Sequence, residues 1–340
     1  MSKLSDRSSL STEQSASIVR PFEGLSRIQP QVAGIDIGAH ELAVCIPGEG
    51  ETQIVRFFGT YTADLHALAD WLAANAIQSL AAESTGVYWI PIFEVLEGRG
   101  FECCLINAAS IRRFPGRKSD VLDCQWIQTL HSYGLLADSF RPEADLIALR
   151  TLLRHRTQLI QHRSPHILRM QKALIQMNIQ LSQVLSDVTG KTGLAIIRAI
   201  VAGERDPHTL ATLRNYRCKK SEEAIALALT GTWREEHLFV LQQSLELFDF
   251  YTRQIEACDA EIERTYSAIR PDWGPPVQDE QPPRPRKRGS HCKNEPAHAA
   301  AIRQHIRRIA GVDLVALPGL SVSLAQIILS EVGSSLERFE

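Results

Sequence analysis

The sequence predicts an α/β N-terminal domain and then an all-α region with a long coiled-coil-like helix and a helical hairpin at the C-terminus. Short apolar runs typical of strands fill the first third, they alternate with amphipathic segments, and strand-like sequence almost vanishes after residue 142. We expect five segments: a disordered tail (1–30), the α/β domain (31–142), a helical region (143–270), a disordered Pro/Arg-rich linker (271–300) and a C-terminal segment (301–340).

The composition excludes several classes of protein. The chain has 340 residues, 44% of them hydrophobic, which is enough for two domains with separate cores. Its formal net charge of -2 gives no global signature of nucleic-acid binding, so that interpretation needs local charge. No apolar run approaches the ~18 residues of a membrane span. The seven cysteines contain no paired CxxC, so we expect reduced thiols in a cytoplasmic protein without a zinc site.

The strands and helices of the α/β domain follow from hydrophobic patterning. VAGIDIG predicts a buried strand that carries Asp36, and ELAVCIPG and TQIVRFFG predict two more strands in a meander. Residues 63–76 place their leucines on one helical face. SLAAES predicts a buried strand that ends at Glu83, residues 90–98 predict a helix, and FECCLIN predicts a further strand. Three leading strands followed by this alternation favour a mixed sheet.

Two carboxylates occur one helical turn apart in the stretch GRKSDVLDCQWIQ. Asp120 and Asp123 are separated by three residues in a segment with helical patterning, so both leave the same helix face. Anions held this close are costly unless a cation relieves them. Mg²⁺ suits the task because it takes carboxylate oxygens and keeps positions open for phosphate. The same spacing also fits a solvated acidic helix face.

Two further carboxylates end predicted strands. Asp36 closes the first strand and Glu83 the fourth, and in open sheets chemistry gathers at strand ends. Four converging carboxylates would hold two divalent ions, Mg²⁺ or alternatively Mn²⁺, for phosphodiester chemistry. Taken singly, Asp36 also fits a turn residue before Gly38, and Glu83 also fits the start of a helix.

A long stretch without acidic residues predicts a nucleic-acid surface. No Asp or Glu occurs between Asp145 and Asp187, whereas cations recur there between apolar positions. Such a stretch indicates a surface facing phosphate, or a solvated helix face whose counter-charges lie elsewhere in the fold. With the loop after the last predicted strand, the expected contacts are Arg112, Arg113, Arg117, Lys118, Arg150, Arg154, Arg156, Arg163, Arg169 and Lys172.

Two later segments predict features of assembly and of phosphate binding. Residues 235–269 show a three-four alternation of apolar positions, typical of a coiled-coil seam with a second copy or of an amphipathic helix packed in its own chain. A homo-oligomer, dimer or tetramer, follows from the first interpretation. LPGLSVSLAQIIL is similar to a phosphate-binding helix-hairpin-helix, although Ser321 replaces its second turn glycine, and a plain αα-hairpin is the alternative.

The motifs together resemble a known family. GIDIG with Asp36, ESTGVYW with Glu83, KSDVLDC with Asp120 and Asp123, and LPGLSVSLAQIILSEVGS with the trailing ERF resemble the DEDD transposases of the insertion-sequence one-hundred-and-ten family. The resemblance runs from about Val32 to the end of the chain. It implies a RuvC-like domain whose four acids bind Mg²⁺ and are catalytic, a coiled-coil middle and a C-terminal transposase domain.

The resemblance also implies an activity and partners. Members cut and rejoin DNA as multimers guided by a structured RNA, which places the protein in the prokaryotic cytoplasm at the nucleoid. In the family a serine of the C-terminal domain becomes linked to a DNA end. No serine of this chain lies in the matching position. We therefore expect no catalytic serine here and a truncated member, with 301–340 as the incomplete start of the transposase domain.

The leading functional hypothesis is a transposase or site-specific DNA recombinase of an insertion sequence. A RuvC/RNase-H-like nuclease that stops at hydrolysis is one alternative, and a catalytically dead nucleic-acid-binding truncation product is another. An actin-like sugar kinase or ATPase also begins with strand–DxG–hairpin, as GIDIGAHELAV does. That class needs a second phosphate loop in a later sheet, and the sequence after residue 142 has almost no strand character.

Overall fold

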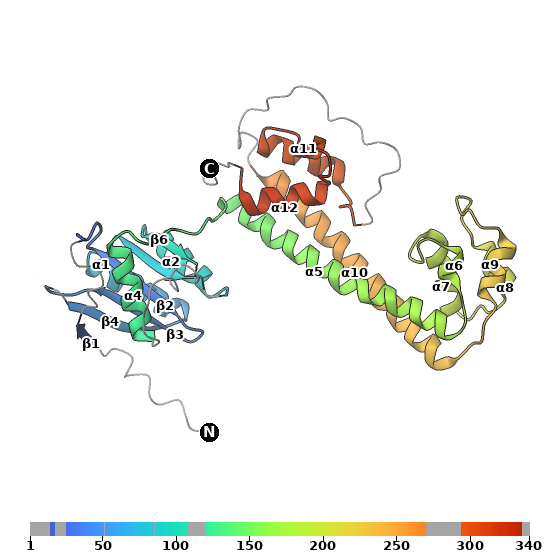
Figure 1. Cartoon of the computed structure of the whole chain (residues 1–340), viewed down its shortest axis with the longest axis horizontal. Helices are drawn as coiled ribbons and strands as arrows, with labels where there is room; N and C mark the ends of the chain where they lie inside the picture. Colours follow the sequence, from blue (N-terminus) through green and yellow to red (C-terminus); the bar gives the residue numbers. More distant parts are fainter. Residues whose placement is uncertain are drawn as a thin grey trace, which may run out of the picture. The chain divides into compact units, whose positions relative to one another are not determined.

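The computed structural model describes residues 14–17, 25–50, 52–84, 86–107, 120–269 and 294–334, with the side chains of 14–17 and 120–122 left aside. The chain divides into two compact units, Met1–Arg141 and Pro142–Glu340 (Figure 1). The division falls at the predicted boundary between the α/β domain and the helical region.

A mixed sheet forms the first unit, in the strand order β1-β4-β3-β2-β5-β6. β2, β3 and β4 form the predicted antiparallel meander, whereas β5 is parallel to β2, and β6 is parallel to β5. The elements of this unit are β1 (Gln14–Ser17), β2 (Val32–Ile37), β3 (Glu41–Pro47), β4 (Thr52–Gly59), α1 (Thr62–Ala74), β5 (Ser79–Glu83), α2 (Trp89–Gly98), β6 (Glu102–Ile106) and α4 (Asp120–Ser132).

Strand β1 differs from the sequence prediction. Gln14–Ser17 were expected within a disordered tail, but they pair antiparallel with the edge strand β4. The QSAS sequence has no apolar alternation to indicate a strand. Backbone hydrogen bonds to an exposed sheet edge can recruit such a polar segment.

Helices cover both faces of this sheet. Apolar side chains of β2 and β5, such as Ile35 and Leu80, share a core with α1 and α2, including Leu72 and Phe93. The opposite face packs on α4, which contacts β2, β3 and β5. Alternation along each strand therefore decides which residues face α4.

Gly34 on β2 allows α4 to lie directly on the sheet. A Cβ at this position would lie 2.3 Å from the carbonyl oxygen of Cys124 and 2.3 Å from the amide nitrogen of Gln128. Buried polar contacts also hold α4 in place: Gln53 Nε2 donates to Gln128 Oε1 at 2.7 Å, and Ser79 Oγ lies 2.8 Å from His131 Nε2. The position of α4 over β2 and β5 is therefore closely defined.

A pair of long antiparallel helices forms the frame of the second unit, with a separate cluster of short helices near each end (Figure 1). Helices α6–α9 enclose one core with the adjoining parts of α5 and α10, and α11, η1 and α12 enclose another. The elements are α5 (Ala144–Gln176), α6 (Leu181–Val184), α7 (Lys191–Val201), α8 (Pro207–Thr212), α9 (Glu222–Leu229), α10 (Glu235–Ala268), α11 (Ala299–Ala310), η1 (Leu314–Ala316) and α12 (Val322–Val332).

The apolar seam of α10 is covered within the chain. Leu241 and Phe248 belong to the core shared with α5–α9, whereas Ile262 and Tyr266 belong to the core shared with α11 and α12. These seam residues therefore pack against other helices of the same chain, not against a second copy. The seam gives no argument for an oligomer. The predicted helical hairpin is present as α11 and α12, with the LPGL turn between η1 and α12.

None of the helices in the described ranges combines the length and the apolarity needed to cross a lipid bilayer. The predicted linker 271–300 lies outside the described residues up to residue 293, and α11 begins at Ala299 inside its last part.

Candidate active site

Asp36 and Glu83 end neighbouring parallel strands at the same level of the sheet. The register pairs Gly34 with Ala81 and Ile35 with Ala82, so the next position along places Asp36 beside Glu83. Parallel strands lie about 4.8 Å apart, and side chains in register leave the same face. Both side chains are partly exposed. The two carboxylates, which the sequence predicted to converge, are thus neighbours at the carboxyl edge of β2 and β5.

The face that carries this pair is the face covered by α4. Gly34, two residues before Asp36, contacts the backbone of α4, and Ser79, four residues before Glu83, bonds to His131 of α4. Because side chains alternate along a strand, Asp36 and Glu83 share that face with Gly34 and Ser79. They lie at the carboxyl end of β2 and β5 on that face.

The direction of α4 brings its first turn towards the same edge. Cys124 and Gln128 lie over Gly34, and Gln128 Nε2 also donates to the carbonyl of Val32 at the beginning of β2. The helix therefore runs antiparallel to β2, and its N-terminal residues lie nearest the strand end. At about 1.5 Å per helical residue and about 3.3 Å per strand residue, the first turn is level with Asp36.

Asp120 and Asp123 both belong to that first turn. Asp120 is the first residue of α4, and the side chain of Asp123 is exposed to solvent. The four predicted acids thus occupy two strand ends and one helix start. Among the side chains that the structure describes, which leave out that of Asp120, no group of three or more His, Cys, Asp or Glu residues is arranged to hold a metal ion.

The donors available at this edge are carboxylate oxygens. Oxygen donors suit Mg²⁺ and Mn²⁺. The thiols of Cys45 and Cys124 are fully buried, and burial together with the neighbouring Cys124 raises the pKa of Cys45 far above its usual range. Burial also raises the pKa of Cys104 on β6 to about 11. The thiols of Cys45 and Cys104 therefore stay protonated and are poor metal ligands.

The predicted nucleic-acid contacts divide into two groups. Arg112, Arg113, Arg117 and Lys118 lie outside the described residues. Helix α5 carries the others as one continuous helix. Of these, Arg154, Arg169 and Lys172 are exposed, while Arg150 is partly buried; Arg150 and Arg154 both pair with Glu331 of α12, at 2.6 and 2.8 Å.

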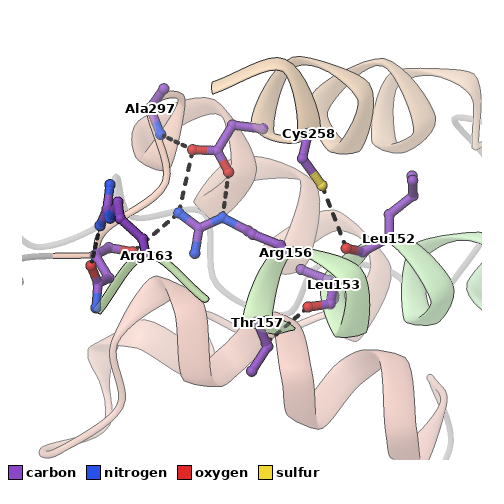
Figure 2. Close-up of polar contacts among 9 residues, drawn as sticks. Leu152, Leu153, Arg156, Thr157, Arg163, Cys258 and Ala297 are labelled. Atoms are coloured by element: carbon purple, nitrogen blue, oxygen red, sulfur yellow. Dashed lines mark hydrogen bonds and ion pairs between the residues drawn. The ribbon is translucent and has the colours of Figure 1, made fainter. Parts of the chain in front are cut away.

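Arg156 belongs to the interior of the helical unit. It forms an ion pair with Asp259 of α10, and the two side chains are only 7% and 4% exposed (Figure 2). Arg163 donates to the side chain of Asn294 at 2.9 Å and lies over the ring of Phe248. The counter-charge of Arg156 thus lies elsewhere in the fold, as the alternative interpretation described, and its burial is incompatible with a surface facing phosphate.

A second group of cations was not singled out from the sequence. Lys191, Arg217, Lys219 and Lys220 line a cavity of about 650 Å³ among the short helices α6–α9. The string RNYRCKK (214–220) carries the signal that could have found them, because it interleaves basic residues with an aromatic one. The cavity itself could not be predicted, because Lys191 is distant in sequence from residues 214–220.

Comparison with known proteins gives one family. Residues 33–179 match the model of the family DEDD_Tnp_IS110, described as "Transposase". No curated protein matches the chain. The match begins in β2 and ends just after α5, so it covers both strand-end acids and the start of α4. The match supports a DNA-acting enzyme of the transposase kind. Residues 33–179 are therefore similar to the DEDD transposase domain of the IS110 family, which supports the resemblance noted from the motifs with Asp36, Glu83, Asp120 and Asp123.

Proposed function

We propose that the chain is a metal-dependent DNA transposase, or site-specific recombinase, whose Asp36, Glu83, Asp120 and Asp123 bind Mg²⁺ and are catalytic. The observation that carries this proposal is the register of β2 and β5, which makes neighbours of two acids 47 positions apart (83 − 36). The antiparallel course of α4 supports it, since the helix start faces the same edge. The ribonuclease-H/RuvC-like type of the sheet belongs to the same proposal, supported by the strand order and the family match.

The chain's own residues supply position and charge. Asp36 and Glu83 are held by a hydrogen-bonded sheet, which limits how far their oxygens can move. The N-terminus of α4 offsets part of the repulsion among the acids, because the helix dipole is positive there. Asp36, Glu83, Asp120 and Asp123 would hold Mg²⁺, which would polarise the scissile phosphate and stabilise charge on the attacking and leaving oxygens. The four carboxylates therefore orient a phosphodiester for in-line attack.

Strand cleavage tests this proposal directly. The purified chain is incubated with element-end DNA and Mg²⁺, and Asp36→Asn, Glu83→Gln and Asp123→Asn are each expected to abolish product while the protein stays folded. Glu102→Gln is the matched control, because Glu102 begins β6 at the opposite, amino end of the parallel strands. Activity that survives both Asp36→Asn and Glu83→Gln contradicts the site. Cutting without any rejoining favours the nuclease alternative, and Mg²⁺-independent DNA binding without cutting favours a catalytically dead binder.

The partners proposed are DNA, a structured guide RNA and further copies of the chain. The family match supports DNA, and the resemblance alone supports the RNA and the homo-oligomer. Sequencing of the RNA that copurifies with the chain tests the second partner, and one recurring structured species is expected. Recovery of nothing but fragments of abundant cellular RNA would count against the guide RNA. Mass photometry tests whether the chain forms a homo-oligomer, and dimers or tetramers are expected.

A further inference from the structure

The cavity among the short helices of the second unit has an unusual charge. It is lined by the segment 182–187, by the start of α7 and by residues of 215–220. Four of its lining residues are exposed cations: Lys191, Arg217, Lys219 and Lys220. The one acid is Asp187, whose Oδ1 accepts hydrogen bonds from the backbone and hydroxyl of Thr189. In a chain with a formal net charge of -2, this is a local concentration of positive charge.

None of these four cations forms an ion pair with a carboxylate of the residues that the structure describes. By contrast, Arg198 forms an ion pair with Asp249, and Arg214 forms one with Glu222. Four like charges around one hollow repel each other, and an anionic ligand removes that cost. The first backbone amides of α7 add to the field, since Gly190 provides no side-chain cap there.

The fold fixes the walls of this cavity. The amide of Asn215 donates to the buried Thr192 hydroxyl at 2.9 Å, which attaches the basic segment to the first turn of α7. Gly193 lets the segment before α7 lie against the helix, because a Cβ there would lie 2.1 Å from the carbonyl oxygen of Val188. The cations are therefore presented from two segments that are held together.

An aromatic side chain stands beside the cations. Tyr216 is 78% exposed, although large aromatic side chains usually bury most of their surface. Arg217 Nε donates to the Tyr216 hydroxyl at 2.9 Å, and its guanidinium lies 5.3 Å from the ring centroid. The ring is thus braced by a cation and open to solvent. An exposed ring next to a basic groove is the arrangement on which unpaired bases stack.

We propose that this cavity binds an unpaired strand of nucleic acid, with its phosphates on Lys191, Lys219 and Lys220 and a base on Tyr216. Charge complementarity selects a polyanion. The exposed ring selects a single strand, because the bases of a duplex are already stacked on one another. The site is separate from the carboxylates of the first unit, so nucleic-acid binding here does not depend on metal binding there.

Fluorescence anisotropy with the full-length chain tests this site. The probes are labelled 20-nucleotide single-stranded DNA and RNA and a duplex of the same sequence, with EDTA present to prevent cleavage. Lys219→Ala with Lys220→Ala is expected to weaken single-strand binding and to lower the salt slope by about 1.4, which is ~0.7 for each lost phosphate contact. Arg234→Ala with Arg253→Ala is the matched control, because both are exposed cations of the same unit outside the cavity. An equal effect of the two double variants overturns the proposal.

The tyrosine variants separate stacking from charge. Tyr216→Ala is expected to weaken single-strand binding about tenfold and duplex binding far less, whereas Tyr216→Phe keeps the ring and is expected to keep the affinity. Ultraviolet crosslinking is expected to join the strand to Tyr216, and the tighter-binding probe identifies the occupant as DNA or RNA. A crosslink pattern that omits residues 214–220 overturns the site. These readouts do not involve the four carboxylates, so failure here leaves the proposed activity intact, and loss of cleavage there leaves this site intact.

Discussion

Arg156 of α5 and Asp259 of α10 form a buried ion pair that ties three segments of the second unit together. Nε and Nη2 of Arg156 donate to the two carboxylate oxygens of Asp259. The same carboxylate accepts the amide of Ala297 at 3.0 Å, and Arg156 Nη2 also donates to the carbonyl of Asn294 at 3.1 Å. Figure 2 shows Arg156 and Ala297 meeting at this group. The pair thus joins both long helices to the segment that enters α11.

Removing one partner of this pair should destabilise the second unit strongly. Arg156→Met is expected to lower the free energy of unfolding by about 3–5 kcal/mol, because it leaves the buried carboxylate without its cation. Arg154→Met is the matched control; its pair with Glu331 is 60% exposed on the arginine side and should cost about 1 kcal/mol or less. Urea unfolding measures both. Equal losses in the two variants would contradict the assigned role of the buried pair.

Gly34 should be intolerant of any side chain. Gly34→Ala is expected to cost about 1–3 kcal/mol and to reduce DNA cleavage, because the added Cβ pushes the start of α4 away from the strand-end acids. Gly98→Ala is the control, since nothing lies within 4 Å of a Cβ there. Thermal unfolding and the cleavage assay are read together. Full activity in a folded Gly34→Ala protein would show that the position of α4 over β2 does not matter to catalysis.

Acid should destabilise the first unit through His131. Burial lowers the pKa of His131 from its ordinary value of 6.5, so the folded unit binds fewer protons than the unfolded chain near and below that pH. Stability that is present above about pH 6.5 is therefore lost as the pH falls through the lowered folded value. His131→Gln can keep a hydrogen bond to Ser79 and does not titrate. Unfolding measured at about pH 7.5 and about pH 5.5 should show a smaller loss of stability at the lower pH in the variant. Identical losses in the two proteins would exclude His131 as the cause.

Removal of the carboxylate shared by Arg150 and Arg154 of α5 should change DNA binding. Glu331→Gln removes the carboxylate that pairs with Arg150 and Arg154. If these arginines face phosphate, DNA affinity is expected to rise a few-fold and its salt dependence to steepen, because cations are freed for phosphate contacts. Filter binding over a range of salt measures this. Unchanged affinity would mean that the two arginines serve only the contact between α5 and α12.

Much of the first unit could be predicted because its strands are short, apolar and punctuated. The apolar runs that end near Asp36 and Glu83 predicted where both strands end. The alternation of apolar and polar residues predicted the three-strand meander. The sequence also predicted that the two acids lie side by side, but not the register of β2 with β5 that places Asp36 beside Glu83. Strand β1 was missed because QSAS forms a strand only through backbone pairing to an edge.

The second unit shows what periodicity leaves open. The three-four alternation of 235–269 gave the buried face of α10 correctly, but not its partner, which is α5 of the same chain. The acid-free stretch gave a basic helix, but the acid that neutralises Arg156 lies 103 residues away. Lys191 and the 214–220 segment come together only through the packing of α7. Pairings that are distant in sequence thus account for most of what was missed.

The location of bound metal tests the central claim most directly. Crystals of the full chain soaked in Mn²⁺ should show an anomalous peak about 2.0–2.3 Å from carboxylate oxygens of both Asp36 and Glu83, with Asp120 or Asp123 completing the shell. The peak should vanish in Asp36→Asn crystals and persist in Glu102→Gln crystals. A peak elsewhere, or Asp36 and Glu83 pointing apart with no shared ion, would contradict the proposed site.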